Sequence, residues 1–155
     1  MSEFVDDCQF DTDQPAFLPE TYVPGSSERM LLYRELDGMQ TDAQVEAYRQ
    51  RLEDRFGRLP DEARGLLSIV ELRRLGRQLA VERLTLKNDK LILTFVARKN
   101  SPFYDSAEFA GILRFVNQYS KQCHFDPNND ICRLVVSKVA SLQKALEIMR
   151  SMKSA

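Results

Sequence analysis

The chain has 155 residues, of which 43% are hydrophobic and 29% charged, and this length favours one domain. The composition excludes disordered and fibrous proteins, and the absence of an apolar run of roughly 20 residues or of a signal-peptide hydrophobic region excludes membrane and secretory proteins. The 22 basic and 23 acidic residues give a net charge of −1, so the chain lacks the overall basic field that favours nucleic acid.

Residues 1–27 are expected to form an extended, acidic lead-in, with one short strand near Cys8–Phe10. They hold three of the six prolines, and residues 1–28 contain seven acids and no base, which leaves a net charge of +6 for the rest of the chain. A helix is then expected from Ser27 to Gly38. Its apolar face consists of Leu32, Tyr33 and Leu36.

A second helix is the most clearly predicted element. Thr41 is expected to be its N-cap, because Gln44 three residues later completes a capping box, and Gly57 supplies a C-terminal stop. The apolar stripe of this helix consists of Val45, Tyr48, Leu52 and Phe56.

A third helix is expected to start at Pro60, and it carries two apolar faces. One face consists of Ala63, Leu66, Leu67 and Val70, and the nearly opposite face of Leu72, Leu75 and Leu79. The helix either packs on both sides or breaks near residue 70. The first alternative is favoured, because no proline interrupts the segment.

Two hairpins and two further helices complete the chain. The strands Val81–Leu86 and Leu91–Ala97 enclose a turn at 87–90, and the extended segments Gln122–Asp126 and Cys132–Val139 enclose a second turn at 127–130. Between the hairpins, a helix capped by Asp105, with Glu108 at its third position, has the stripe Phe109, Ile112, Leu113 and Val116. A last helix starts at Ser141 and buries Leu142, Ala145, Leu146, Met149 and Met152. Five helices and two hairpins without a βαβ unit predict one compact α+β domain, with one small antiparallel sheet or two.

The sequence lacks the motifs of most catalytic and cofactor sites. No two glycines are closer than eight residues, so no phosphate-binding loop is present. A single histidine, His124, cannot build a multi-histidine metal site, and its apolar–polar surroundings are typical of a strand. The odd set of Cys8, Cys123 and Cys132 predicts reduced thiols in the cytoplasm. We expect no metal, no cofactor and no catalysis by this chain alone, and keep an unrecognised hydrolase only as a remote alternative.

Two stretches resemble a known family. The first combines Tyr-Val-Pro at 22–24 with Ser-Glu-Arg-Met-Leu-Leu-Tyr-Arg-Glu-Leu at 27–36, and the second is Leu-Glu-Asp-Arg-Phe-Gly-Arg-Leu-Pro at 52–60, leading into Leu66-Leu67. Together they resemble the C-terminal domain of the bacterial transcription-repair coupling factor. The resemblance is strong over residues 17–80, and beyond them only the order of elements matches.

The resemblance implies a function that the residues alone do not. Members of the family are large ATP-driven DNA translocases that displace stalled RNA polymerase and recruit the damage sensor UvrA for nucleotide excision repair. Their motor, which binds ATP and Mg²⁺, precedes this domain, so the chain is expected to be a fragment. Residues 28–155 would form a regulatory domain, which packs on the UvrB-like module of the parent, masks its UvrA-binding surface and represses the parent.

The segment around Gly57 also has a structural interpretation, which is favoured over a direct functional one. Phe56 is expected to dock the end of the second helix, Gly57 to adopt a left-handed cap, Leu59 to fill the corner and Pro60 to start the next helix.

The outer face of the second helix is the first candidate site. Asp54 lies about 200° around the helix from Leu52 and points away from the apolar stripe. The resemblance implies an arginine-bearing partner surface for Asp54, with Glu53 as a less certain neighbour. Arg51 departs from the acidic character of some relatives and is close enough to neutralise Asp54. A solvated helix face is the slightly favoured alternative.

Two basic segments are further candidates. Arg73, Arg74 and Arg77 lie within about 100° on the third helix, with Arg83 following, and could bind phosphate. The alternative is a solvated face paired with Glu71 and the acidic N-terminal segment. The run 98–104 combines basic and aromatic residues that could bind single strands, but such aromatics more often dock a loop. An accessory nucleic-acid-binding module is therefore the second functional hypothesis.

Overall fold

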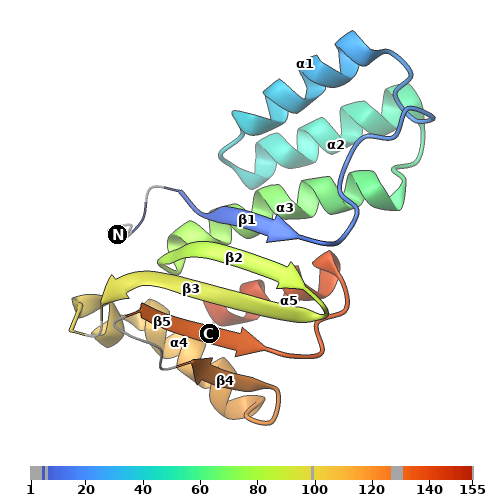
Figure 1. The fold of residues 1–155 in the computed structure, drawn as a ribbon. Coiled ribbons are helices and arrows are strands. Elements are labelled where there is room, and N and C mark those ends of the chain that lie inside the picture. The colour runs from blue at the N-terminus through green and yellow to red at the C-terminus, as the bar shows by residue number, and fades with distance from the viewer. Residues whose placement is uncertain (1–4, 6, 99, 127–130, 155) are drawn as a thin grey trace. The chain divides into compact units, whose positions relative to one another are not determined.

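A computed structural model describes residue 5 and residues 7–98, 100–126 and 131–154. The chain forms two compact units (Figure 1). The helical unit comprises Pro15–Glu71, and the sheet unit comprises Met1–Gln14 together with Leu72–Ala155. No helix among the described residues has the length and apolar character needed to cross a membrane.

The helical unit contains α1 (Ser26–Asp37), α2 (Asp42–Phe56) and the first part of α3 (Asp61–Gln78). The predicted capping box of α2 is confirmed, because the Thr41 side chain accepts from the Gln44 backbone N–H and the Gln44 side chain accepts from the Thr41 backbone N–H. α3 begins one residue later than predicted. The Pro60 carbonyl accepts the first helical hydrogen bonds, so proline precedes the helix instead of opening it.

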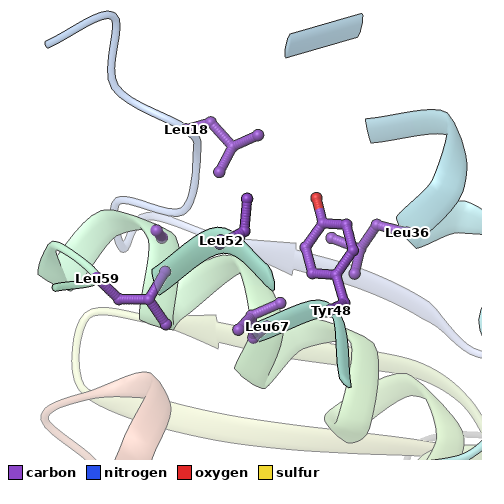
Figure 2. Packing of buried hydrophobic residues seen from close by; sticks show 7 residues of the cluster. Leu18, Leu36, Tyr48, Leu52, Leu59 and Leu67 are labelled. Atoms are coloured by element: carbon purple, nitrogen blue, oxygen red, sulfur yellow. The ribbon is translucent and has the colours of Figure 1, made fainter. Parts of the chain in front are cut away.

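The core of the helical unit forms between the three helices and the segment that precedes them (Figure 2). Its buried members are Leu18, Leu36, Tyr48, Leu52, Leu59, Ala63 and Leu67. The Tyr48 hydroxyl donates a 2.9 Å hydrogen bond to the Leu32 carbonyl, so the buried phenol is satisfied. Burial raises the pKa of this phenol further above its ordinary value.

The two apolar faces of α3 are explained by the two units. The helix is unbroken, as predicted. Ala63 and Leu67 are buried in the core of the helical unit, whereas Leu72, Leu75 and Leu79 are buried and belong to the sheet unit. The change of face near residue 70 coincides with the division between the units.

The sheet unit contains one five-stranded mixed sheet in the order β1-β2-β3-β5-β4. The strands are β1 (Gln9–Thr12), β2 (Val81–Lys87), β3 (Lys90–Arg98), β4 (Cys123–Asp126) and β5 (Ile131–Val136). α4 (Ala107–Gln118) and α5 (Leu142–Ser154) both lie behind the sheet in the view of Figure 1. The predicted α+β class is confirmed, and β1, which pairs in parallel with β2, adds a strand contact that the two hairpins did not predict.

The first hairpin is closed by two residues with positive φ, Asn88 at 53° and Asp89 at 61°, as tight hairpin turns require. In the second hairpin the predicted turn at 127–130 lies outside the described residues. The strand predicted as Cys132–Val139 ends at Val136, and Lys138 adopts a φ of 60°.

α4 corrects two predictions. Its N-cap is Ser106, whose side chain accepts a 3.2 Å hydrogen bond from the Phe109 N–H, and Asp105 instead ends a short 3₁₀ helix, η1 (Pro102–Asp105). Phe115 is buried on α4, whereas the predicted Leu113 is 38% exposed. α5 confirms its predicted stripe, because Leu142, Ala145, Leu146, Met149 and Met152 are all buried.

Candidate functional site

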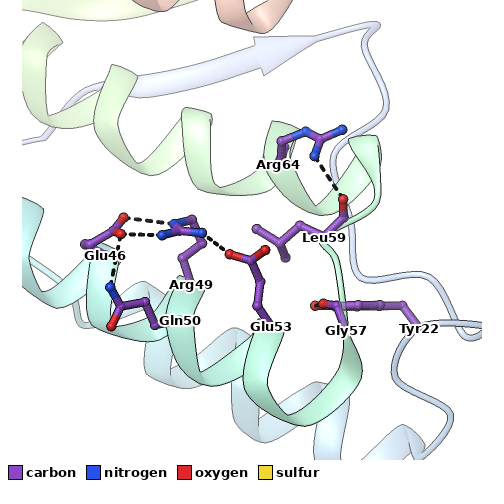
Figure 3. Close-up of polar contacts among 8 residues, drawn as sticks. All are labelled: Tyr22, Glu46, Arg49, Gln50, Glu53, Gly57, Leu59 and Arg64. Atoms are coloured by element: carbon purple, nitrogen blue, oxygen red, sulfur yellow. Dashed lines mark hydrogen bonds and ion pairs between the residues drawn. The ribbon is translucent and has the colours of Figure 1, made fainter.

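The corner between α2 and α3 combines a glycine with positive φ and a side-chain hydrogen bond to a backbone carbonyl. Gly57 adopts φ 91° and ψ −167°, so its φ is positive as predicted, but its ψ lies outside the left-handed helical region. Leu59 is buried, and its carbonyl accepts a 3.0 Å hydrogen bond from Nη1 of Arg64 (Figure 3). The arginine of α3 thus holds the corner that the Phe-Gly-Arg-Leu-Pro run makes.

Tyr22 connects the two sequence stretches on which the family resemblance depends. Its hydroxyl donates a 2.7 Å hydrogen bond to the Gly57 carbonyl (Figure 3), and its ring centroid lies 5.6 Å from that of Phe56. Burial raises the pKa of the Tyr22 phenol above its ordinary value. No local sequence pattern predicts this contact, because its partners are 35 residues apart.

Arg49 lies on one flank of α2 and forms ion pairs with two acidic residues of the same helix. Its guanidinium pairs with Glu46 one turn before it and with Glu53 one turn after it (Figure 3). Hydrogen bonding to Arg49 lowers the pKa of Glu46. Glu53, a predicted site residue, therefore has its charge compensated within the helix.

The other flank of α2 is bridged to α1. Arg51 pairs with Glu35, and Arg55 pairs with Glu28. Arg51 also lies over the Tyr48 ring, with its guanidinium carbon 5.7 Å from the ring centroid. The sequence suggested that Arg51 neutralises Asp54, but its partner is on the neighbouring helix.

Asp54 lies between these two flanks on the exposed face of α2. Within the part of the chain that the structure describes, it makes no ion pair and no hydrogen bond through its side chain. Of the three predicted contact residues, Asp54 is therefore the one with an uncompensated charge available to a partner.

One arginine of the predicted basic patch on α3 has partners inside the sheet unit. Arg73 donates from Nε to the Cys8 carbonyl at 2.9 Å and pairs with Asp7 at 2.8 Å. Arg74 is half-buried, and burial together with neighbouring Arg77 lowers its pKa. The predicted pairing with the acidic N-terminal segment is confirmed for Arg73. Arg83, which follows the patch in sequence, is exposed on β2, in the strand predicted as Val81–Leu86.

The aromatic residues of the run 98–104 form part of the core. Phe103 is fully buried, with its ring 5.7 Å from Phe95 and 5.4 Å from Phe109, and Tyr104 lies 4.9 Å from Phe109. Burial and the neighbouring Cys132 raise the pKa of Tyr104 to about 12. This is the loop-docking alternative, not a stacking platform. The side chains of the two basic residues at 98 and 99 lie outside the described part of the structure.

Comparisons with known proteins match the chain to one family and one fold. The model of the TRCF domain family matches residues 12–106. The transcription-repair-coupling factor of Rickettsia prowazekii (strain Madrid E) is 35% identical over 115 residues, which are 74% of this chain and 10% of the relative. The protein of the same name from Escherichia coli (strain K12) is 35% identical over 86 residues, or 56% of this chain and 7% of the relative.

Among solved structures, the crystal structure of a C-terminal domain of transcription-repair coupling factor matches with a TM-score of 0.75 and 18% sequence identity. The match covers 96% of this chain and 94% of that one, and it shows a common fold. The chain spans about a tenth of the length of the Rickettsia relative.

Proposed function

Because the chain belongs to the TRCF domain family, we propose that it is a non-catalytic regulatory domain that docks on the UvrB-like module of its parent and masks the UvrA-binding surface there. The family resemblance drawn from the two motif stretches is confirmed, and the fold matches that of a C-terminal domain of this family. In this proposal the ATP-driven motor, its Mg²⁺, and the contacts with DNA and RNA polymerase belong to other parts of the parent.

The observation that supports this proposal is the free carboxylate of Asp54. The neighbouring acids and bases of α2 are paired with one another or with α1, so among the described charged residues of this helix Asp54 is the one whose side chain has no ion pair or hydrogen bond. A partner arginine would satisfy it. One pair at the rim of an interface is worth roughly 0.2–1 kcal/mol, whereas two like charges placed together cost several. Reversal of this charge is therefore more informative than its removal.

The test is Asp54→Arg in the full-length parent. The variant is expected to bind UvrA more tightly and to hydrolyse ATP faster without RNA polymerase, because the docked domain is released. The matched control is Asp37→Arg, which reverses another exposed acid of the helical unit that has no ion pair among the described residues. Both variants should melt at the wild-type temperature.

The outcomes separate the residue from the function. Unchanged UvrA affinity in a folded Asp54→Arg parent would remove Asp54 from the interface. Unchanged affinity after deletion of residues 1–155 would reject masking itself.

The accessory nucleic-acid module is the weaker proposal, because Arg73 is engaged by Asp7 and the Cys8 carbonyl. We expect the isolated chain to bind duplex DNA with a Kd of about 10⁻⁴ M or weaker at physiological salt. Submicromolar binding that falls steeply with salt and is lost on replacing Arg73, Arg74 and Arg77 would reverse this preference.

A further inference from the structure

Leu31 is an unexplained apolar residue on the surface of α1. Its side chain is 62% exposed, the largest value among the large hydrophobic residues that the structure describes as exposed. The buried and half-buried side of α1 is formed by Leu32, Tyr33 and Leu36, so Leu31 takes no part in the core.

The ion pairs between α1 and α2 locate Leu31 on its helix. Glu28 precedes it by three residues and Glu35 follows it by four, so all three residues lie along one side of α1. Both glutamates reach arginines of α2, namely Arg55 and Arg51. Leu31 therefore lies on the side of α1 next to α2, between two bridges that connect the helices.

The same bridges place Asp54 at the level of Leu31. The early Glu28 pairs with the late Arg55 and the late Glu35 with the earlier Arg51, so the two helices run antiparallel. Asp54 lies between the two arginines on α2, as Leu31 lies between the two glutamates on α1. Both side chains are exposed, and each points away from the apolar face of its own helix, so they share the outer surface of the helical hairpin.

We propose that Leu31 is the apolar anchor of the docking surface that contains Asp54, and that this surface fits a protein patch with an apolar pocket beside an arginine. The inference rests on the proposed function, in which the patch belongs to the UvrB-like module. Charge complementarity selects the arginine, and the two flanking ion pairs form a polar rim that keeps water from a buried leucine. Arg51 is paired with Glu35, so the Asp54 carboxylate is the charge left for the partner. A single exposed ion pair contributes little, and the leucine therefore supplies most of the contact energy.

The experiment compares Leu31→Gln with Met30→Gln in the full-length parent. Met30 is the matched control because it is 57% exposed on the same helix, but its side chain is rotated by about 100° from that of Leu31. Glutamine keeps the length and helix propensity of both side chains, so both variants should melt as the wild type does. Leu31→Gln is expected to raise UvrA affinity about tenfold, because burial of one leucine is worth about one decade in affinity. Met30→Gln should stay within about twofold.

The inference and the proposed function fail in different ways. If Leu31→Gln changes nothing while deletion of residues 1–155 raises UvrA affinity, masking stands and the anchor is wrong. If the deletion also changes nothing, the proposed function is wrong. Equal effects of the two glutamine variants would likewise overturn the anchor. If the 155-residue chain sediments as a dimer that Leu31→Gln dissociates, the occupant is a second copy and the proposal is overturned.

Discussion

The hydroxyl of Tyr22 donates a hydrogen bond of 2.7 Å to the carbonyl oxygen of Gly57, 35 residues later in the chain. This bond connects the segment before α1 to the corner between α2 and α3. The acceptor belongs to Gly57, whose φ of 91° is rarely adopted by residues other than glycine. The contact therefore stabilises the segment and the corner together.

Tyr22→Phe tests this bond. The ring should keep its contact with Phe56, so the loss is the hydrogen bond alone, and the free energy of unfolding should fall by about 0.5–1.5 kcal/mol. Urea denaturation of both proteins measures the difference. A fall of more than about 3 kcal/mol would mean that the ring also moves, since that exceeds the usual cost of one lost bond.

Gly57→Ala tests the backbone of the corner. No atom lies within 4 Å of the position that an added Cβ would occupy, so any cost comes from the positive φ. We expect destabilisation of about 1–3 kcal/mol. Gly38→Ala is the control, because Gly38 has a φ of −86° and its added Cβ would meet the Glu35 carbonyl at an ordinary 3.7 Å. Thermal denaturation that gave the two variants equal losses would contradict the assignment to φ.

Gly76→Ala tests the packing of α3 against the N-terminal segment of the sheet unit. An added Cβ would lie 2.5 Å from Sγ and 3.1 Å from Cβ of Cys8, and overpacking of this kind costs about 1–3 kcal/mol. Cys8→Ala removes the nearer atom. The double variant should therefore lose less stability than the sum of the single variants, and strict additivity in a denaturation cycle would show that the two positions do not touch.

Cys8 also predicts how stability responds to alkaline pH. Burial raises the pKa of its thiol from 9.0 to about 12. The unfolded chain releases the thiol proton near pH 9, whereas the folded chain retains it. The contribution of the neutral thiol to the free energy of unfolding is therefore complete below pH 9 and is lost as the pH rises towards 12. Each pH unit above 9 should cost about 1.4 kcal/mol in the wild type relative to Cys8→Ala. Unfolding curves at pH 8, 9.5 and 10.5 measure the two slopes, and parallel slopes would contradict the prediction.

Local signals account for the elements that the sequence predicts well. Thr41 and Gln44 lie three residues apart, and the two apolar faces of α3 follow one another along one helix, so both features can be read from short windows. The error at α4 is also local. Asp105 and Ser106 are both good caps, and the 3₁₀ turn that begins at Pro102 uses the aspartate and leaves the serine to cap the helix.

Partners distant in sequence account for what could not be predicted. The position of Asp54 opposite the apolar stripe predicts that it is exposed, but its availability depends on Glu35, which engages Arg51 from another helix. The spacing of Arg73 on α3 is compatible with a phosphate ligand, but its guanidinium is engaged by Asp7 and the Cys8 carbonyl. A helical wheel gives the direction of a side chain, and only the tertiary fold shows which other charge meets it.

The position of β1 has a consequence for the order of folding. Thr12 of β1 is paired with Leu86 of β2, whereas Pro15–Glu71 forms a unit that is continuous in sequence. During synthesis the helical unit can therefore close first, and the first strand must wait for its neighbour. Pairing β1 with β2 closes the long loop between them, which costs conformational entropy, and contacts between residues so distant in sequence form slowly. The addition of β1 should therefore be a late step in folding. Until β1 is in place Cys8 stays accessible to thiol reagents, so the rate at which Cys8 becomes protected from them reports when the sheet is complete.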